Sequence, residues 1–76
     1  MTGQQLRKRR QALRGRSGAP LSLQELATDA GIGIGTLHRY ETKQPRTELR
    51  QRGLDPVRIG MIETTLERLE LKAAGH

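Results

Sequence analysis

The feature that most constrains this chain is the stretch 22–41, in which two short helical patterns meet at a glycine. Ser22, with Glu25 three residues later, forms the pattern of a capping box and predicts the start of a helix. Gly31 accepts the left-handed backbone conformation that commonly ends a helix. We therefore predict a helix over 23–30 that is followed by a tight turn.

A second helix over 34–42 is expected after the turn, with Leu37 and Tyr40 pointing inward at three-residue spacing. Two helices cross closely only where a small side chain separates their backbones, and Ala27 provides one. Ile32 and Leu37 are expected to fill the angle between the helices. This combination is typical of a helix-turn-helix, whose second helix lies in the major groove of DNA.

The rest of the chain also has a helical pattern. The remaining helices are expected over 3–14, 47–52 and 56–73. Asp55 and Pro56 mark the start of the last one, because aspartate caps a helix and proline is tolerated at its first position. Since no strand pattern and no internal repeat is present, we predict an all-α protein of about five helices.

We divide the chain into a helix-turn-helix domain over 1–54 and a C-terminal helix over 55–76. Apolar residues of this helix form a narrow seam, which Val57, Met61 and Leu71 widen. The seam is expected to pack on the core, and its extra width predicts that the helix also joins two copies of the protein. The predicted dimerisation residues are Val57, Ile59, Met61, Ile62, Leu66 and Leu69.

Size and composition argue against several functions. Among 76 residues, 33% are apolar and Phe, Trp and Cys are absent, so the core must be aliphatic and little chain remains to line a deep pocket. The lack of cysteine excludes a disulfide scaffold and a thiolate zinc site, and His38 and His76 alone do not make a metal site. We therefore expect no enzyme activity, no metal and no cofactor.

Hydropathy and charge indicate where the protein works and what it binds. The absence of a long apolar run predicts no membrane span, and a cytoplasmic protein is the default expectation. The net charge is +6, with six basic residues in 1–22, six in 38–58, and a slightly acidic segment over 59–76. This segregation predicts a polyanionic partner, although a solubilising face is the simpler alternative.

The sequence resembles the phage repressor and Cro family of helix-turn-helix proteins, also called the xenobiotic-response-element family of bacterial regulators. The matching residues are Leu6, Arg10, Ser22, Glu25-Leu26-Ala27, Gly31-Ile32, Thr36-Leu37 and Arg39-Tyr40-Glu41. The resemblance covers about residues 4–46, with an insertion in the first loop. It implies a lambda-repressor-like fold and a double-stranded DNA partner.

The resemblance also implies which residues read bases. These positions are Gly33, Ile34, Gly35, His38 and Arg39. Arg39 is the best candidate for a base contact because a guanidinium pairs with both acceptors of guanine; a phosphate contact is the alternative. Ile34 would touch a thymine methyl group or simply pack in the core. His38 would donate to DNA or stand exposed without a contact.

Further positions are implied to bind phosphate. They are Ser22, Thr36, Thr42, Lys43 and Arg46, to which we add Arg14 and Arg16 beside the long first loop as a hypothesis of our own. Ser22 and Thr36 have a simpler alternative role as helix caps. Arg10 and Glu41 match a pair that forms an internal salt bridge.

This chain departs from the family in three places: Leu23 and the pair Gly33 and Gly35 stand where polar residues are usual, and the loop from Gly15 to Pro20 is longer than usual. The DNA contact that the family makes at Leu23 is expected to be missing. A glycine inside a helix costs about 0.5–1 kcal/mol relative to alanine. Close approach of the backbone to DNA would explain the two glycines, and a loosely tolerated helix start is the alternative.

The leading hypothesis is a sequence-specific DNA-binding transcriptional regulator of bacterial, phage or plasmid type. It would be a dimeric repressor that binds an inverted repeat and controls its own operon, for example an anti-CRISPR-associated one. One alternative is an antitoxin whose C-terminal helix folds on a partner protein that the sequence does not identify. Another is an RNA-binding helix-turn-helix protein. This alternative is disfavoured because Tyr40 is the single aromatic residue available for stacking on bases.

Overall fold

The computed structural model describes residues 1–75, and His76, one of the two histidines considered above, lies outside them. The described chain is all-helical, as predicted. It consists of α1 (Gly3–Ala12), α2 (Leu23–Ala30), α3 (Ile34–Thr42), a 3-10 turn η1 (Leu49–Gln51) and α4 (Pro56–Gly75). None of these helices is long and apolar enough to cross a membrane.

The short helix expected over 47–52 is reduced to the 3-10 turn η1, so residues 1–75 contain four α-helices rather than about five. The backbone before η1 is engaged elsewhere: Thr2 and Glu48 form an isolated antiparallel bridge, and the Leu49 amide donates to the carbonyl of Met1 at 3.0 Å. These long-range hydrogen bonds hold the Glu48 backbone at ψ 131°, far from the helical value of about −42°. No helix can therefore continue through this residue.

The first helix is also shorter than expected, ending at Ala12 rather than at residue 14. Leu13 is extended, and its carbonyl accepts a hydrogen bond from the Leu21 amide at 2.9 Å. Arg14 and Pro20 form a second isolated bridge. The segment 13–22 is therefore a closed loop whose two ends lie side by side.

The turn between α2 and α3 has the expected geometry. The Ser22 hydroxyl accepts from the Glu25 amide at 3.1 Å, so the N-cap is formed. The Glu25 carboxylate instead accepts from the Arg16 amide, so only half of the expected capping box is present. Gly31 has φ +73°, and its amide donates to the carbonyls at the end of α2. Glycine adopts this left-handed conformation without steric cost.

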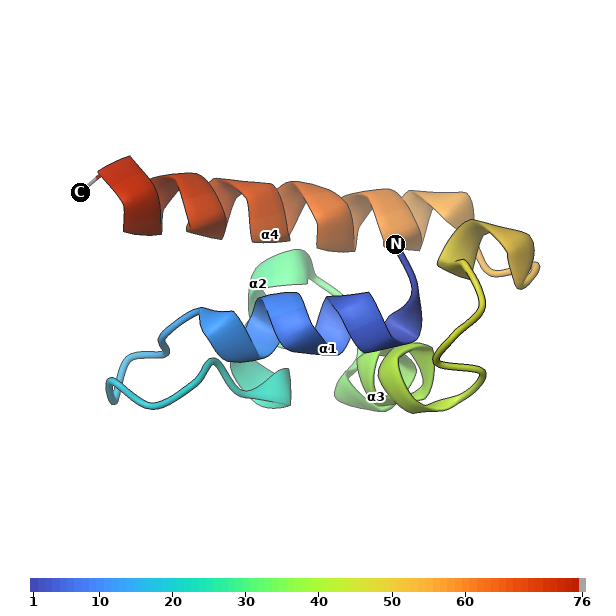
Figure 1. Ribbon diagram of the computed structural model, residues 1–76, viewed down its shortest axis with the longest axis horizontal. Helices are drawn as coiled ribbons and strands as arrows, with labels where there is room; N and C mark the ends of the chain where they lie inside the picture. The colour runs from blue at the N-terminus through green and yellow to red at the C-terminus, as the bar shows by residue number, and fades with distance from the viewer. Residues whose placement is uncertain (76) are drawn as a thin grey trace.

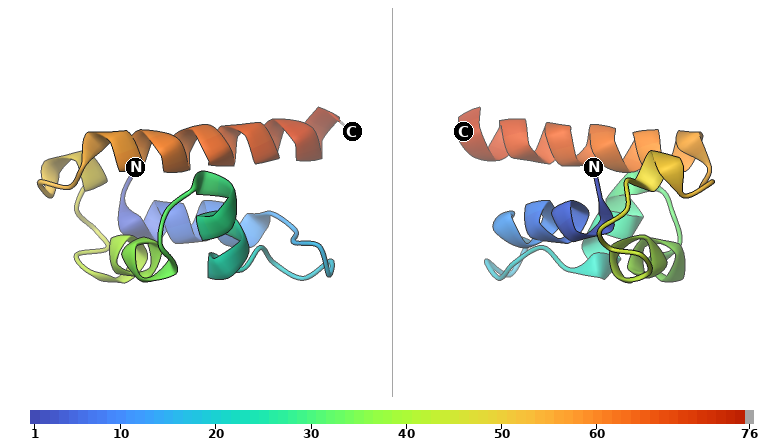
Figure 2. Two further views of the ribbon diagram at one scale, coloured as in Figure 1. Left: turned by 180° about the vertical axis from the view of Figure 1, so that it is seen from behind. Right: turned by 45° about the vertical axis from the view of Figure 1, so that its right-hand side comes forward.

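Figures 1 and 2 show α3 and α4 on opposite sides of the molecule, with α1 and α2 between them. The core is aliphatic: its fully buried large side chains are Leu6, Leu26, Leu37, Leu49, Ile59, Ile62 and Leu66. The last three belong to α4, so this helix closes the core on the side away from α3. In both figures the loop 13–22 lies at the same end of the molecule as the C-terminus of α4.

Candidate nucleic-acid interface

The exposed face of α3 is set by its buried residues. Leu37, Tyr40 and Glu41 face the core. At 100° per residue the opposite side of the helix carries Gly35, His38, Arg39 and Thr42, which are all exposed. Arg39 therefore lies near the centre of the outward face. Ile34 is 45% exposed at its edge, so this side chain is not committed to the core.

The two glycines before and within α3 differ in what they do for the fold. Gly33 is the N-cap and lies outside the helix, so no helical cost applies to it. Gly35 lies inside the first turn, and a Cβ added there would meet no atom within 4 Å. The free protein therefore has no steric reason to keep glycine at position 35.

The polar side chains around α3 are only partly occupied by the fold. Ser22 caps α2, and Thr42 donates through its hydroxyl to the carbonyl of His38 at 2.8 Å. Both side chains remain exposed. Thr36 is half-buried and does not cap α3, since its side chain forms no hydrogen bond to the backbone of residues 1–75.

The basic residues divide into a paired and an unpaired set. Arg9 pairs with Glu70 and Arg50 with Glu63, in each case at 2.6 Å. A second set of exposed cations forms no ion pair within residues 1–75. This unpaired set includes Arg14, Arg16, Arg39, Lys43 and Arg46. Charge counting along the sequence could not separate the two sets, because pairing joins residues that are far apart in the chain.

Four of the cations unpaired within residues 1–75 flank α3, namely Arg14, Arg16, Lys43 and Arg46, whereas others, such as Arg68 and Lys72, lie on α4. Arg14 and Arg16 belong to the loop 13–22 at one end of the molecule, and Figures 1 and 2 show the segment 43–47 at the other end. Both segments lie on the side of α3, away from α4. The molecule extends 36 Å along its longest axis, about one turn of duplex DNA. One side of the protein therefore combines an exposed helix with cations at both ends.

A buried ion pair fixes the position of α3. The Arg10 guanidinium donates to both Glu41 carboxylate oxygens, at 2.7 and 3.0 Å. Its third hydrogen bond, at 2.7 Å, reaches the carbonyl of Leu21 just before α2. This is the pair that the family resemblance implies, and it ties α1, α3 and the approach to α2 together.

Arg52 also supports α3, a role that the sequence did not reveal. Its guanidinium donates to the carbonyl of Tyr40 at 3.1 Å, and to that of Arg39 at 3.5 Å. These carbonyls lie in the last turn of α3, where a cation is favourable. The Arg39 carbonyl also accepts from the Lys43 amide at 3.0 Å, so the 3.1 Å bond to Tyr40 is the main contribution of Arg52. Nothing in the local pattern around Arg52 indicates this contact, because it spans about a dozen residues.

Leu23 is one of the positions at which this chain differs from the family it resembles. The resemblance places a DNA-contacting polar side chain at this position, but Leu23 is partly buried and packs against the core. Its side chain therefore contributes to stability rather than to a polar contact. Among residues 1–75, no group of His, Cys, Asp and Glu side chains is arranged to hold a metal ion.

The set of predicted dimerisation residues needs correction. Ile59, Ile62 and Leu66 are at most 1% exposed and belong to the core of the single chain, so they cannot contact a second copy. Leu69 is partly buried against the same core. Of the predicted dimerisation residues, only Val57 and Met61 remain exposed, since the others pack in the protein's own core.

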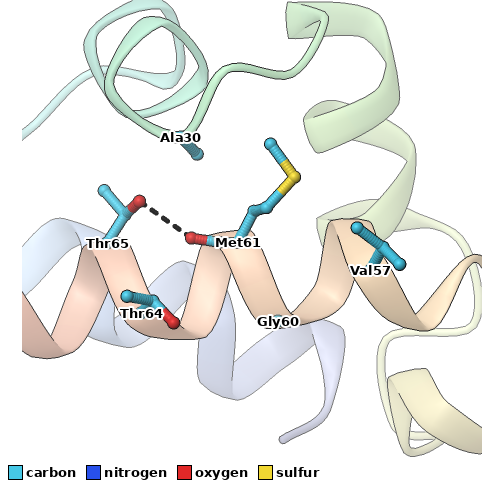
Figure 3. A pocket seen from close by; sticks show the side chains of 6 residues that line it. All are labelled: Ala30, Val57, Gly60, Met61, Thr64 and Thr65. Atoms are coloured by element: carbon cyan, nitrogen blue, oxygen red, sulfur yellow. Dashed lines mark hydrogen bonds between the residues drawn. The ribbon is translucent and has the colours of Figure 1, made fainter.

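Val57 and Met61 border a shallow hollow between α4 and the end of α2, with a volume of about 400 Å³ (Figure 3). Figure 3 shows Met61 reaching from α4 toward the segment at Ala30. Val57 is 67% and Met61 38% exposed. Gly60, which also lines the hollow, leaves open space where a side chain would be. This flank of α4 is therefore an exposed apolar surface.

Searches of protein-family models, of curated proteins and of solved structures find no match to this chain.

Proposed function

We propose that this protein is a sequence-specific, double-stranded DNA-binding transcriptional regulator of the phage repressor and Cro helix-turn-helix type. The observation that carries the proposal is the arrangement of helix and charge on the side of the molecule away from α4. There, an exposed helix is flanked at both ends by cations that form no ion pair with any residue the structure describes. Phosphate backbones supply the opposite charge, and such contacts dominate the affinity of DNA-binding proteins.

In this proposal α3 enters the major groove and Arg39 reads a base, because its guanidinium lies on the outward face of the helix and pairs well with guanine. Arg14 and Arg16 bind the backbone at one end, and Lys43 and Arg46 bind it at the other. Phosphate contacts of this kind fix orientation and register, whereas base contacts provide the sequence preference. Ser22, Thr36 and Thr42 are further candidates for phosphate contacts.

The proposed protein acts as a dimer. A single helix-turn-helix covers few base pairs, and family dimers read half-sites about 34–36 Å apart. The flank of α4 that carries Val57 and Met61 is the proposed contact between protomers. A dimer bound to an inverted repeat in its own promoter would exclude polymerase and make the protein an autorepressor.

The antitoxin alternative has less support. It requires a C-terminal segment that folds only on a partner, whereas α4 contributes three fully buried side chains to the core of the single chain. The RNA alternative gains no support either, because Tyr40 is buried and therefore unavailable for stacking on a base.

The proposal is tested by fluorescence anisotropy with the duplex upstream of the protein's own gene, a scrambled duplex of equal length, and a single-stranded RNA. We expect the promoter duplex to bind at least a hundredfold more tightly than the scrambled one, with an affinity that falls steeply with salt. Equal binding to both duplexes, or preference for the RNA, would contradict the proposal.

A further inference from the structure

A second concave surface lies between the C-terminal half of α4 and the loop 13–22. Its volume is about 820 Å³, twice that of the hollow beside Val57. Figure 1 shows the end of α4 extending past α1 above this loop. The sequence suggested that so short a chain lines no deep pocket; the space arises instead at the edge of the core, between two elements that diverge. We call it the loop cleft.

The wall of the loop cleft is held in place by hydrogen bonds. The loop closes on itself through the Gly15 amide, which donates to the carbonyl of Ala19 at 2.7 Å. The Glu25 carboxylate accepts from the Arg16 amide at 3.2 Å and packs directly on Gly15, where an added Cβ would lie 2.6 Å from its oxygen. The loop is thereby fastened to α2, so hydrogen bonds within the chain hold this wall of the cleft.

The floor of the loop cleft is aliphatic. Leu13, Leu21 and Leu69 line it together with two alanines. The lining contains no aromatic side chain. A flexible aliphatic group would therefore find apolar contact here, whereas a flat ring would find no stacking partner.

The rim of the loop cleft is cationic. Four basic residues line it, of which Arg68 and Lys72 lie four residues apart on one face of α4, and Arg14 and Arg16 come from the loop. None of the four forms an ion pair within residues 1–75. Two carboxylates also line the cleft: that of Glu25 accepts a hydrogen bond from the loop amide of Arg16, whereas that of Asp29 forms no ion pair among the described residues. The cleft therefore carries excess positive charge beside apolar surface.

We propose that the loop cleft binds a small amphipathic anion, namely an aliphatic carboxylate of medium chain length. Its chain lies on the leucines, and its carboxylate lies between Arg68 and Lys72. The volume is within the range of small-molecule sites, about 300–1,000 Å³. The carboxylate itself is placed on Arg68 and Lys72 of α4, on the side of the molecule away from α3. Arg14 and Arg16, which complete the rim, are the two residues of the cleft that are also proposed above to bind DNA phosphates.

The test is a titration of the full chain with sodium octanoate and sodium hexanoate, followed by calorimetry and by amide chemical shifts. We expect saturable binding, shifts confined to 12–21 and 66–73, and a Kd that falls about fourfold for each added methylene. Octylammonium, with the same chain and the opposite charge, should not bind. Binding of octylammonium as tight as that of octanoate would overturn the proposal.

Matched variants locate the charge contribution. Arg68→Ala with Lys72→Ala should weaken octanoate binding at least tenfold. Arg7→Ala with Lys8→Ala removes the same charge from exposed positions of α1 outside the cleft and should leave the Kd unchanged. Asp29→Asn removes a carboxylate of the rim and should tighten binding severalfold, which keeps the test decisive if the first variant unfolds. Equal losses in both double variants, or no effect of Asp29→Asn, would contradict the proposal. Saturable binding seen only with an acidic peptide, or only with octanoate assembled into vesicles, would also contradict it.

Discussion

The Arg10 guanidinium holds the Glu41 carboxylate through two hydrogen bonds, of 2.7 and 3.0 Å, in the interior between α1 and α3. The Glu41 side chain is 2% exposed and that of Arg10 is 11% exposed. The orientation of the proposed reading helix therefore depends on a contact that is largely buried. A variant that loses this contact would lose the fold of the interface and not only one interaction.

Replacing Arg10 with Met should destabilise the protein by about 3–5 kcal/mol, because it leaves the Glu41 charge buried without a partner. Urea unfolding followed by circular dichroism measures the change. The double variant Arg10→Met, Glu41→Leu should recover much of the loss, since no charge then remains buried. A single variant as stable as the wild type would show that the pair is dispensable.

Gly35→Ala separates the two explanations of the glycine in α3. Because an added Cβ meets open space in the free protein, alanine should stabilise the helix by about 0.5–1 kcal/mol. If DNA approaches the backbone closely here, the same variant should bind the promoter duplex at least tenfold more weakly. Thermal unfolding and anisotropy give the two values. A more stable variant with unchanged affinity would mean that the glycine is merely tolerated.

Arg39→Ala should weaken specific binding by about 1–3 kcal/mol and relax the preference at one base pair. The reason is the loss of a bidentate base contact from the centre of the exposed face. Binding to a panel of duplexes with single base-pair changes measures both effects. Arg68→Ala, which removes an exposed cation from α4, is the matched control and should affect all duplexes little. An Arg39 variant that weakens every duplex equally would assign this side chain to phosphate.

Val57→Glu tests the flank of α4 as the contact between protomers. Since Val57 is 67% exposed in the single chain, the variant should fold normally, become monomeric, and bind a full inverted repeat no better than a half-site. Sedimentation and anisotropy measure these outcomes. Ala74→Glu places the same charge at an exposed position about 100° around α4 from Val57 and should remain dimeric. A dimeric Val57 variant would exclude this flank.

The Arg9 and Glu70 ion pair predicts a small dependence of stability on pH. The hydrogen bond from Arg9 lowers the pKa of the Glu70 carboxyl below its ordinary 4.5. The pair therefore stabilises the protein above the unfolded pKa, and this contribution disappears as the pH falls through the lowered folded value. Because both side chains are about one-third exposed, it should amount to no more than about 1 kcal/mol.

Comparing the wild type with Glu70→Gln in urea, at neutral pH and at successive steps below pH 4.5, isolates this contribution. The two proteins should differ at neutral pH and converge in acid. A constant difference over the whole range would show that the glutamate stabilises through packing instead of charge.

The sequence by itself determined the elements whose geometry is local. Ser22 caps α2 and Gly31 ends it because both effects involve backbone groups a few residues away. The inward positions of Leu37 and Tyr40 follow from helical periodicity in the same way. The all-α class, the start of α4 and the outward face of α3 were therefore predictable.

Only the tertiary structure decided how these elements use their side chains. The segment 47–52 does not form the expected helix, because its backbone forms hydrogen bonds with the N-terminal residues. The Glu25 side chain does not complete the capping box, because it accepts a hydrogen bond from the Arg16 amide. Ile59 and its neighbours went to the core, which left Val57 and Met61 exposed. Arg9 and Arg39 both lie on helices, yet they differ in pairing. Arg9 forms an ion pair with Glu70, 61 residues further along the chain, whereas Arg39 forms none within residues 1–75. Such outcomes depend on which distant segments meet, and local periodicity contains no information about that.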